Sequence, residues 1–310
     1  MEIVIGSRGS KLALWQSEWV KARLEALGAG ATVRIEVIKT SGDVMRDVPL
    51  ASIGGQGAFT KELELALLDR RVDLAVHSLK DLPTITPDGL AITATPERED
   101  PRDALVLRAG ADSANASLRG LGRGAVVGTS SLRRIAQLRH LRPDVRVKDL
   151  RGNVDTRLRK LDSGEFDAVI LASAGLRRLG FADRISAAIE TDEMLPAVSQ
   201  GALGLETRAD DAETVALVSR LDHAPTRSAV LAERALLRSL GGGCQVPIAA
   251  HATLDGGRLR LEGLVASLDG AEVIRDSFEG DASDAASVGE ALAARMLGRG
   301  AGSLLADTPT

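Results

Sequence analysis

The chain has 310 residues, enough for two or three domains, and its 44% hydrophobic and 26% charged residues are ordinary for a globular protein. This composition excludes a disordered or collagen-like chain, and the single cysteine, Cys244, excludes an internal disulfide and a cysteine-rich metal site. The four histidines have no metal-ligand spacing, so we expect no metal. The sequence contains no targeting signal and no apolar run approaching ~18 residues, which predicts a cytoplasmic protein that does not contact membranes.

The net charge of −4 conceals an uneven distribution along the chain. Residues 119–184 contain fifteen Lys or Arg against seven Asp or Glu, so this segment carries +8 and the remainder −12. A basic segment in an acidic protein favours an anionic ligand held at one place over general binding of polyanions. With 2% aromatic residues and an acidic net charge, a nucleic-acid partner is not expected.

The first third of the chain alternates between short apolar runs and amphipathic stretches, which predicts strands alternating with helices. Between the second strand and the second helix, residues 40–58 are irregular and rich in glycine, as in a functional loop. Thr60 has the character of a helix N-cap. The predicted elements are a strand at 2–5, a helix at 11–27, a strand at 32–39, a helix from 60 to about 70, and strands at 73–78, 90–95 and 104–108.

The same pattern repeats in the second third of the chain. Strands are predicted at 125–128, 145–150 and 167–172, and residues 129–131 are expected to cap a helix that carries Arg133 and Arg134 in its first turn. Two such lobes, roughly 1–96 and 101–193, predict mostly parallel sheets with helices on both faces.

The remainder of the chain changes character. Residues 196–206 form an apolar return segment toward the first lobe, and a helix is predicted at 226–240. Turns at residues 255–257 and 269–270 then separate hairpin strands, and an alanine-rich helix is expected at 282–297. The sequence therefore predicts an α/β protein with two lobes and a small C-terminal α+β domain.

Hydroxyl and cationic side chains follow the predicted strands, where open α/β sheets bind ligands. Helix N-termini at the same edge favour anions, and arginine binds carboxylate or phosphate through two donors. We expect the two lobes to present these groups to one shared cleft that holds a ligand with several negative charges. The groups are Arg8, Ser10, Ser78, Lys80, Thr129–Arg134, Arg151 and Arg178.

Asp81 and Cys244 each permit two interpretations. Asp81 is a carboxylate among cations, which either pairs with Lys80 or stabilises a developing positive charge and transfers a proton. Cys244 is either a buried apolar residue or, after the three glycines at 241–243, a thiolate that acts as nucleophile or attachment point. No pairing with histidine and asparagine supports a cysteine protease.

Seven motifs, in order along nearly the whole chain, resemble the porphobilinogen deaminase (hydroxymethylbilane synthase) family. None is decisive alone, but seven in the family's order leave little room for chance. They are RGSKLALWQ at 8–16, HSLKD at 77–81, EREDPRD at 97–103, GTSSLRR at 128–134, LRGN at 150–153, LPAV at 195–198 and GGGCQVP at 241–247.

The resemblance implies a fold, a cofactor and a reaction. Two lobes like type II periplasmic binding proteins, with mixed sheets, would comprise 1–96 plus about 195–218, and 101–193; a third domain would comprise 222–310. Dipyrromethane would be attached covalently through Cys244. The enzyme, a transferase and a monomer, would deaminate porphobilinogen, join four molecules head to tail on this primer in tetrapyrrole (heme) biosynthesis, and release the linear tetrapyrrole by hydrolysis.

The resemblance also assigns roles to residues. Asp81 matches the catalytic aspartate, which stabilises cationic pyrrole intermediates and assists proton transfer. Residues expected to bind the cofactor are Cys244, Ser78, Lys80, Thr129, Ser131, Arg133, Arg134 and Gln200. Residues expected to bind the substrate and the growing polypyrrole chain are Arg8, Ser10, Gln16, Phe59, Arg151, Arg157 and Arg178.

Two positions depart from the family pattern. Gln56 stands where relatives often have lysine, which removes one possible cation from the loop. Ser199 stands where glycine is common, so the local backbone is expected to differ at that position. The glycine-rich segment 42–58 is a candidate cover for the cleft. Two other functional classes stay open at this point: an anion-binding receptor or sensor module, against which the Gly-flanked Cys244 argues, and a nucleic-acid binder using the basic segment.

Overall fold

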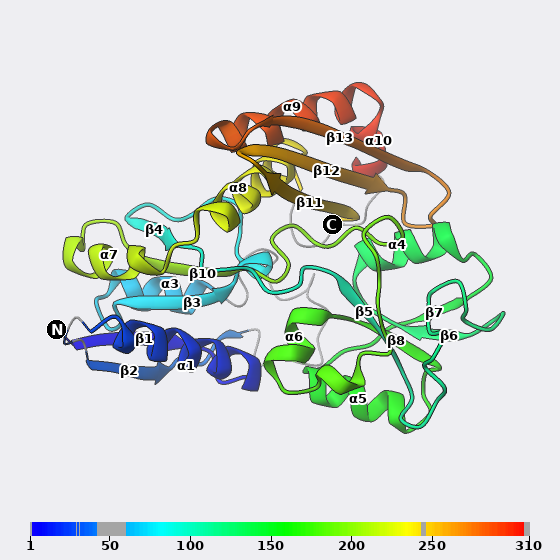
Figure 1. Ribbon diagram of the computed structural model, residues 1–310, viewed down its shortest axis with the longest axis horizontal. Helices are drawn as coiled ribbons and strands as arrows, with labels where there is room; N and C mark the ends of the chain where they lie inside the picture. The colour runs from blue at the N-terminus through cyan, green and yellow to red at the C-terminus, as the bar shows by residue number, and fades with distance from the viewer. Residues whose placement is uncertain (1, 29, 31, 42–59, 243–245, 307–310) are drawn as a thin grey trace. The chain divides into compact units, whose positions relative to one another are not determined.

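The computed structural model describes residues 2–28, 30, 32–41, 60–242 and 246–306 (Figure 1). The chain divides into two compact units, neither of which is continuous in sequence. Unit 1 comprises residues 1–99 and 202–227, and unit 2 comprises residues 100–201 and 228–310.

Unit 1 is built on a five-stranded sheet with the order β2-β1-β3-β10-β4. β1 runs parallel to β2 and β3, whereas β10 is antiparallel to both β3 and β4. The elements of this unit are β1 (Glu2–Ser7), α1 (Lys11–Ala26), β2 (Thr32–Val37), α3 (Lys61–Leu68), β3 (Leu74–Ser78), the 3₁₀ turn η2 (Leu79–Asp81), β4 (Leu90–Ala94), β10 (Leu203–Arg208), α7 (Ala212–Val218) and the 3₁₀ turn η4 (Ser219–Leu221).

Both faces of this sheet are covered because alternate strand residues point to opposite sides. Ile3 and Ile5 of β1 belong to one buried cluster with Val20 and Leu24 of α1. Val4, between them, belongs to a second cluster with the apolar residues of α3. The sheet therefore lies between α1 and α3, and its strand ends carry the first group of predicted site residues.

Unit 2 contains a second five-stranded sheet, of order β7-β6-β8-β5-β9. β6 is parallel to β7 and β8, whereas β5 is antiparallel to β8 and β9. Its elements are β5 (Asp103–Leu107), β6 (Val126–Gly128), α4 (Leu132–Leu141), β7 (Arg146–Lys148), α5 (Val154–Asp162), β8 (Ala168–Ala172), α6 (Ser173–Arg178), the 3₁₀ turn η3 (Ala182–Arg184) and β9 (Ala187–Ala188).

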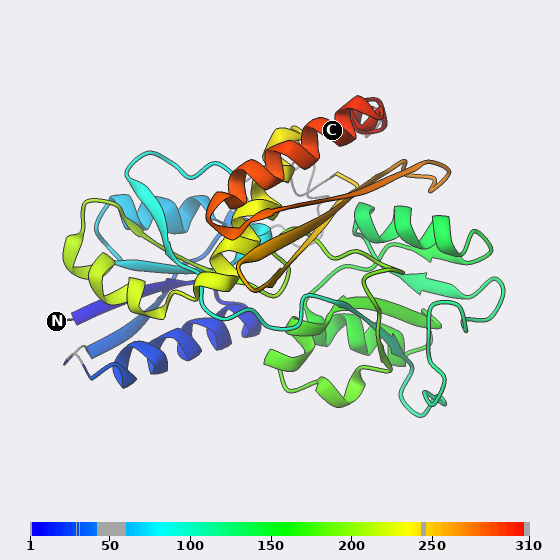
Figure 2. The ribbon, with the colours of Figure 1, turned by 45° about the horizontal axis from the view of Figure 1, so that its top comes forward.

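A three-stranded antiparallel sheet, β11-β12-β13, completes unit 2. Its buried residues Leu259, Leu261 and Val265 share a cluster with α8 and α9, and Figure 2 shows α9 running along the sheet. The elements are α8 (Ala224–Ser239, which begins in unit 1), β11 (Ile248–Asp255), β12 (Arg258–Ala266), β13 (Val273–Asp281), the 3₁₀ turn η5 (Ala282–Asp284), α9 (Ala285–Gly298) and α10 (Ala301–Ala306).

The other face of this small sheet packs against α4. Ala136 of α4 shares a buried cluster with Leu264 and Ala266 of β12. The turn between β12 and β13 reaches the end of the same helix, where His140 Nδ1 lies 2.9 Å from the carbonyl oxygen of Gly270. α4 is therefore held between the two sheets of unit 2.

The structure confirms the predicted fold class of α/β lobes with mixed sheets and a C-terminal α+β part. The interpretation of the sheets as mostly parallel was wrong, because β10 and β5 each run antiparallel to both of their neighbours. The strand predicted at 145–150 is shorter, and α10 was not predicted. The division into three domains stays a prediction. None of the helices in the described residues is long and apolar enough to cross a membrane.

Candidate active site

A small pocket of about 60 Å³ lies in unit 1, where β3 ends and α1 begins. Five of the predicted site residues line it, from segments up to 73 residues apart in sequence. Its lining consists of Arg8, Ser10, Leu12, Ala13, Gln16, Thr60, Val76, His77, Ser78 and Asp81.

The start of α1 is fixed at the pocket by its own side chains. Ser10 is the N-cap, and its Oγ accepts a hydrogen bond from the backbone N–H of Ala13. One and a half turns later, buried Gln16 donates from Nε2 to Ser78 Oγ over 2.8 Å. This contact ties the helix to the last residue of β3, so the two predicted site residues hold each other in place.

Asp81 lies in η2, the turn that follows β3, and its side chain is exposed. Leu79 anchors this turn: its side chain is buried, and its backbone N–H donates to the carbonyl of Ala202. The turn therefore presents a carboxylate at the pocket wall from a fixed backbone. Lys80, between these two residues, is half-buried and does not line the pocket.

Sequence reasoning missed a buried hydrogen-bonded pair, His77 and Glu206, at the pocket. His77 Nε2 lies 2.9 Å from Glu206 Oε2, and both side chains are almost completely buried. Burial, followed by the charge of Glu206, raises the pKa of Glu64 on the neighbouring α3. The signal in the sequence was a glutamate within the otherwise apolar return segment, at Glu206.

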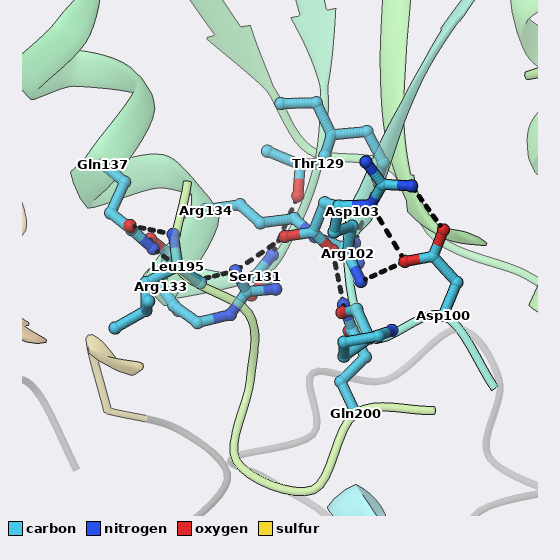
Figure 3. A network of polar contacts seen from close by, with 12 residues as sticks. Asp100, Arg102, Asp103, Thr129, Ser131, Arg133, Arg134, Gln137, Leu195 and Gln200 are labelled. Atoms are coloured by element: carbon cyan, nitrogen blue, oxygen red, sulfur yellow. Dashed lines mark hydrogen bonds and ion pairs between the residues drawn. The ribbon is translucent and has the colours of Figure 1, made fainter. Parts of the chain in front are cut away.

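In unit 2, three predicted residues converge on one buried carboxylate, that of Asp103 (Figure 3). Arg133 Nη1 lies 2.7 Å from Oδ2, and Arg134 Nη2 lies 2.7 Å from Oδ1. Gln200 Nε2 donates to the same Oδ1 over 2.9 Å. These residues come from the first turn of α4 and from the segment before the crossing into unit 1, so Asp103 joins distant parts of the chain.

Backbone carbonyls complete this cluster. Arg133 also donates to the carbonyl of Leu195, and Arg134 to that of Ile170. Gln137, one turn further along α4, accepts from the Leu195 N–H and donates to its carbonyl. The segment carrying Leu195 is thereby fixed against α4.

The electrostatics of the cluster are unbalanced. Burial alone would raise the pKa of the Asp103 carboxyl, but Arg133 and Arg134 lower that pKa well below its ordinary value. Burial also lowers the pKa of the Arg133 guanidinium, and the charge of Arg134 acts in the same direction. One carboxylate therefore faces two cations, and the cluster carries one net positive charge. The buried Nε of Arg133 has no hydrogen-bond partner in the described structure.

The other predicted cations of unit 2 form contacts of their own. Arg151 Nε donates to Asp149, Arg157 Nε to the carbonyl of Gly152, and Arg178 Nη2 to the carbonyl of Gly201. Thr129 Oγ1 accepts from the Ser131 N–H, just before α4. These residues follow β6, β7 and β8, at the strand ends where they were expected. That the two units form one shared cleft stays a prediction.

Several predicted features lie outside the described residues: Phe59, Cys244, Gln56 and the candidate cover at 42–58. Two of the glycines before Cys244, Gly241 and Gly242, lie in the described chain and have structural reasons there. Gly241 follows α8 with φ +70°, and a Cβ on Gly242 would come within 2.5 Å of Ile248 Cδ1. Among the described residues, no group of three or more His, Cys, Asp or Glu is arranged to bind a metal.

Known proteins resemble the chain over nearly its whole length. The family model "Porphobilinogen deaminase, dipyromethane cofactor binding domain" matches residues 3–216, and "Porphobilinogen deaminase, C-terminal domain" matches residues 228–298. The porphobilinogen deaminase of Chromobacterium violaceum is 54% identical over 305 residues, covering 98% of this chain and 97% of that protein. The corresponding protein of Trichlorobacter lovleyi is 51% identical over 303 residues, covering 98% and 95%.

Among solved structures, the periplasmic VFT2 domain of Bordetella pertussis BvgS is similar to this chain, with a TM-score of 0.40 and 18% sequence identity. The similarity covers 71% of this chain and 86% of the VFT2 chain. The family models and the relatives confirm the predicted family, and the first family model confirms the predicted dipyrromethane cofactor. The chain belongs to the porphobilinogen deaminase family of transferases, the hydroxymethylbilane synthases of tetrapyrrole biosynthesis.

Proposed function

We propose that Asp81 is the catalytic residue with which this chain deaminates porphobilinogen and joins four molecules head to tail into hydroxymethylbilane. The observation that carries this proposal is the pocket of unit 1, which Asp81 lines together with the cation Arg8 and with hydrogen-bonding side chains that include Ser10, Gln16 and Ser78. A carboxylate at this wall stabilises the positive charge that develops on the pyrrole as ammonia leaves. It also accepts and returns protons during bond formation.

The remaining pocket residues suit the substrate's carboxylates. Each porphobilinogen carries an acetate and a propionate group, which a guanidinium and hydroxyl donors bind well. Arg8 and Ser10 meet this requirement beside Asp81, and Gln16 and Ser78 hold each other in place. We assign Arg151, Arg157 and Arg178 to the carboxylates of the growing chain, in agreement with their positions after the strands of unit 2.

The residues of unit 2 fit an anionic cofactor. The cluster of Arg133 and Arg134 with Asp103 has one surplus positive charge and an orphaned buried Nε, which an additional carboxylate would complete. Dipyrromethane, when bound, supplies the primer to which the substrate units are added. We propose that Cys244 holds it covalently and that Arg133, Arg134, Gln200, Thr129, Ser131, Ser78 and Lys80 bind its side groups.

We further propose three domains, at 1–96 plus about 195–218, 101–193 and 222–310, and a monomer that works in the cytoplasm without binding nucleic acid. Each of the three sheets has a buried cluster of its own, which supports the division. The net charge of −4 argues against a nucleic-acid partner. Sedimentation of the purified protein with and without DNA tests both the monomer and the absence of binding.

The intact mass of protein purified from cells tests the attachment. We expect an excess equal to two linked pyrrole units, and none in Cys244→Ser. An unmodified wild-type mass, in protein that also takes up no adduct from added porphobilinogen, would return the chain to the class of anion receptors.

Turnover tests the role of Asp81. In Asp81→Asn we expect the fold to be retained and hydroxymethylbilane formation to fall by about 10²- to 10⁴-fold, because the charge that stabilises the cation is removed. Asp88→Asn, at an exposed aspartate seven residues later and outside the pocket lining, is the matched control with unchanged turnover. Wild-type turnover in Asp81→Asn would refute the assignment.

A further inference from the structure

We propose that Asp103 is a positioning residue for the cofactor: its carboxylate holds Arg133, Arg134 and Gln200 in the binding arrangement before any ligand is present. This inference rests on the proposed function, which assigns those three residues to dipyrromethane. Asp103 itself carries no binding role in that assignment. Its part is to act through the side chains that it fixes.

The carboxylate of Asp103 accepts hydrogen bonds from all three side chains, those of Arg133, Arg134 and Gln200. Oδ1 accepts from Arg134 Nε and Nη2 and from Gln200 Nε2, whereas Oδ2 accepts from Arg133 Nη1. The carboxylate is completely buried at the first residue of β5, and β5 pairs with β8 and β9. Because the strand fixes the carboxylate, the guanidinium groups are fixed as well (Figure 3).

The hydrogen bonds that Asp103 accepts leave one buried donor, the Nε–H of Arg133, without a partner among the described residues. Arg133 donates from Nη1 to Asp103 and to the carbonyl of Leu195, and its buried Nε has no hydrogen-bond partner within the described part of the chain. Arg134 uses Nε, Nη1 and Nη2, each for one hydrogen bond. Asp103 thus orients the pair so that the buried Nε–H of Arg133, which has no hydrogen-bond partner among the described residues, is left to donate to an incoming carboxylate.

The charge of Asp103 sets the charge that the ligand meets. Two buried guanidiniums without a carboxylate would repel each other at a high desolvation cost, and two carboxylates would cancel them completely. A single carboxylate leaves one positive charge. The nearby Asp100 does not alter this balance within the cluster, because it pairs with Arg102 over 3.0 Å and lies near Arg177.

The uptake of the adduct from added porphobilinogen by cofactor-free protein tests the proposal. Asp103→Glu keeps the charge but displaces the carboxylate by one methylene, and Asp103→Asn keeps the shape but removes the charge. We expect both variants to take up the adduct at least tenfold more slowly per folded molecule, with Asp103→Asn the slower. Uptake is followed by intact mass, and the folded fraction by circular dichroism and thermal unfolding.

Asp162→Glu is the matched control. Asp162, the last residue of α5, binds Arg184 through both oxygens and makes no hydrogen bond with Asp103, Arg133, Arg134 or Gln200, so its variant is expected to load like the wild type. If Asp103 had only a structural role, slow uptake would disappear after correction for the folded fraction. A folded Asp103→Glu protein that loads at the wild-type rate overturns the proposal.

A second measurement decides the case if neither Asp103 variant folds. In Cys244→Ser, which we expect to carry no cofactor, nitrogen-15 spectra should resolve separate Nη signals for Arg133 and Arg134, because Asp103 stops rotation about their Cζ–Nε bonds. Averaged Nη signals would mean that these side chains are not held before the ligand arrives, against the proposal. Should wild-type protein take up no adduct, the proposed function fails, and these spectra still test the hold of Asp103 on the arginines.

Discussion

Ser199 occupies a backbone conformation that favours glycine. Its φ is +60°, its side chain is completely buried, and its Oγ has no hydrogen-bond partner among the described residues. The conformation is maintained by Glu233, whose carboxylate accepts the Ser199 N–H over 2.6 Å and the N–H of Ala252 on β11. The departure from the family's glycine therefore leaves the glycine-like backbone in place and adds strain to it.

Ser199→Gly is expected to raise the free energy of unfolding by about 1 kcal/mol, because it removes left-handed strain and a buried unpaired hydroxyl, less the added freedom of the unfolded chain. Urea denaturation measures the change. Ser199→Ala separates the two causes, since it removes the hydroxyl and keeps the strain. A loss of stability in Ser199→Gly would contradict this account.

At the level of single residues, sequence analysis identified candidate site residues at the ends of strands. It did not identify the role of Asp103, which belongs to a strand. Arg8, Ser10, Ser78 and Asp81 stand at strand ends, where the pattern of polar residues after apolar runs is readable. Asp103 begins the apolar strand β5, and its role depends on which distant residues meet it. That meeting is set by strand order and packing, which a single sequence does not encode in a local pattern.

Among the elements, the turn between β12 and β13 depends on one glycine. Gly270 has φ +75°, and a Cβ there would lie 2.6 Å from the backbone nitrogen of His140 and 2.8 Å from the carbonyl of Ala136. Arg139 Nη1 donates to the Leu268 carbonyl beside it. The hairpin therefore approaches α4 at backbone distance.

Gly270→Ala is expected to lower the free energy of unfolding by about 2 kcal/mol or more, because the methyl group meets backbone that cannot move aside. Gly257→Ala is the control: that glycine, in the turn between β11 and β12, has φ +85° but nothing within 4 Å of a Cβ. Gly257→Ala is expected to lower the free energy of unfolding by only about 1 kcal/mol, because alanine is strained at this positive φ. Equal losses in urea denaturation would show that contact with α4 adds nothing.

Element types were largely predictable, whereas pairing directions were not. The helix predicted at 11–27 forms as α1, and the strands of the hairpin region form as β11, β12 and β13. In these segments apolar residues recur at the spacing typical of a helix or of a strand. The antiparallel direction of β10 and β5 follows from the crossings of the chain between its units, for which the local sequence carries no period.

Taken as a whole, the molecule depends on ionised carboxylates. In ten aspartates of the described chain, the pKa of the folded state is lowered. Burial acts to raise the pKa of these carboxyl groups, but hydrogen bonds and nearby cations lower it by more. Among the carboxyl groups of the described chain whose pKa shifts are resolved, Glu64 alone has a raised pKa. The ten are Asp100, Asp103, Asp144, Asp149, Asp162, Asp211, Asp222, Asp269, Asp276 and Asp281.

Acid is therefore expected to destabilise the protein. A carboxylate whose folded pKa is depressed contributes its full stability above its unfolded pKa of about 3.9, and loses it as the pH falls toward the folded value. We expect the free energy of unfolding, measured in urea, to fall steadily below about pH 4.5. Glu64 contributes with the opposite sign but is a single half-buried group. Constant stability between pH 5 and pH 3 would contradict the prediction.

The position of β10 has a consequence for synthesis on the ribosome. β10 lies between β3 and β4, yet it follows β4 by more than a hundred residues, during which β5 to β9 are made. At about 5–20 residues per second, β4 emerges roughly 5–20 s before the strand that joins it to the sheet. The sheet of unit 1 is therefore completed late, and the nascent chain carries an unpaired edge at β3 while residues 100–201 of unit 2 are being translated.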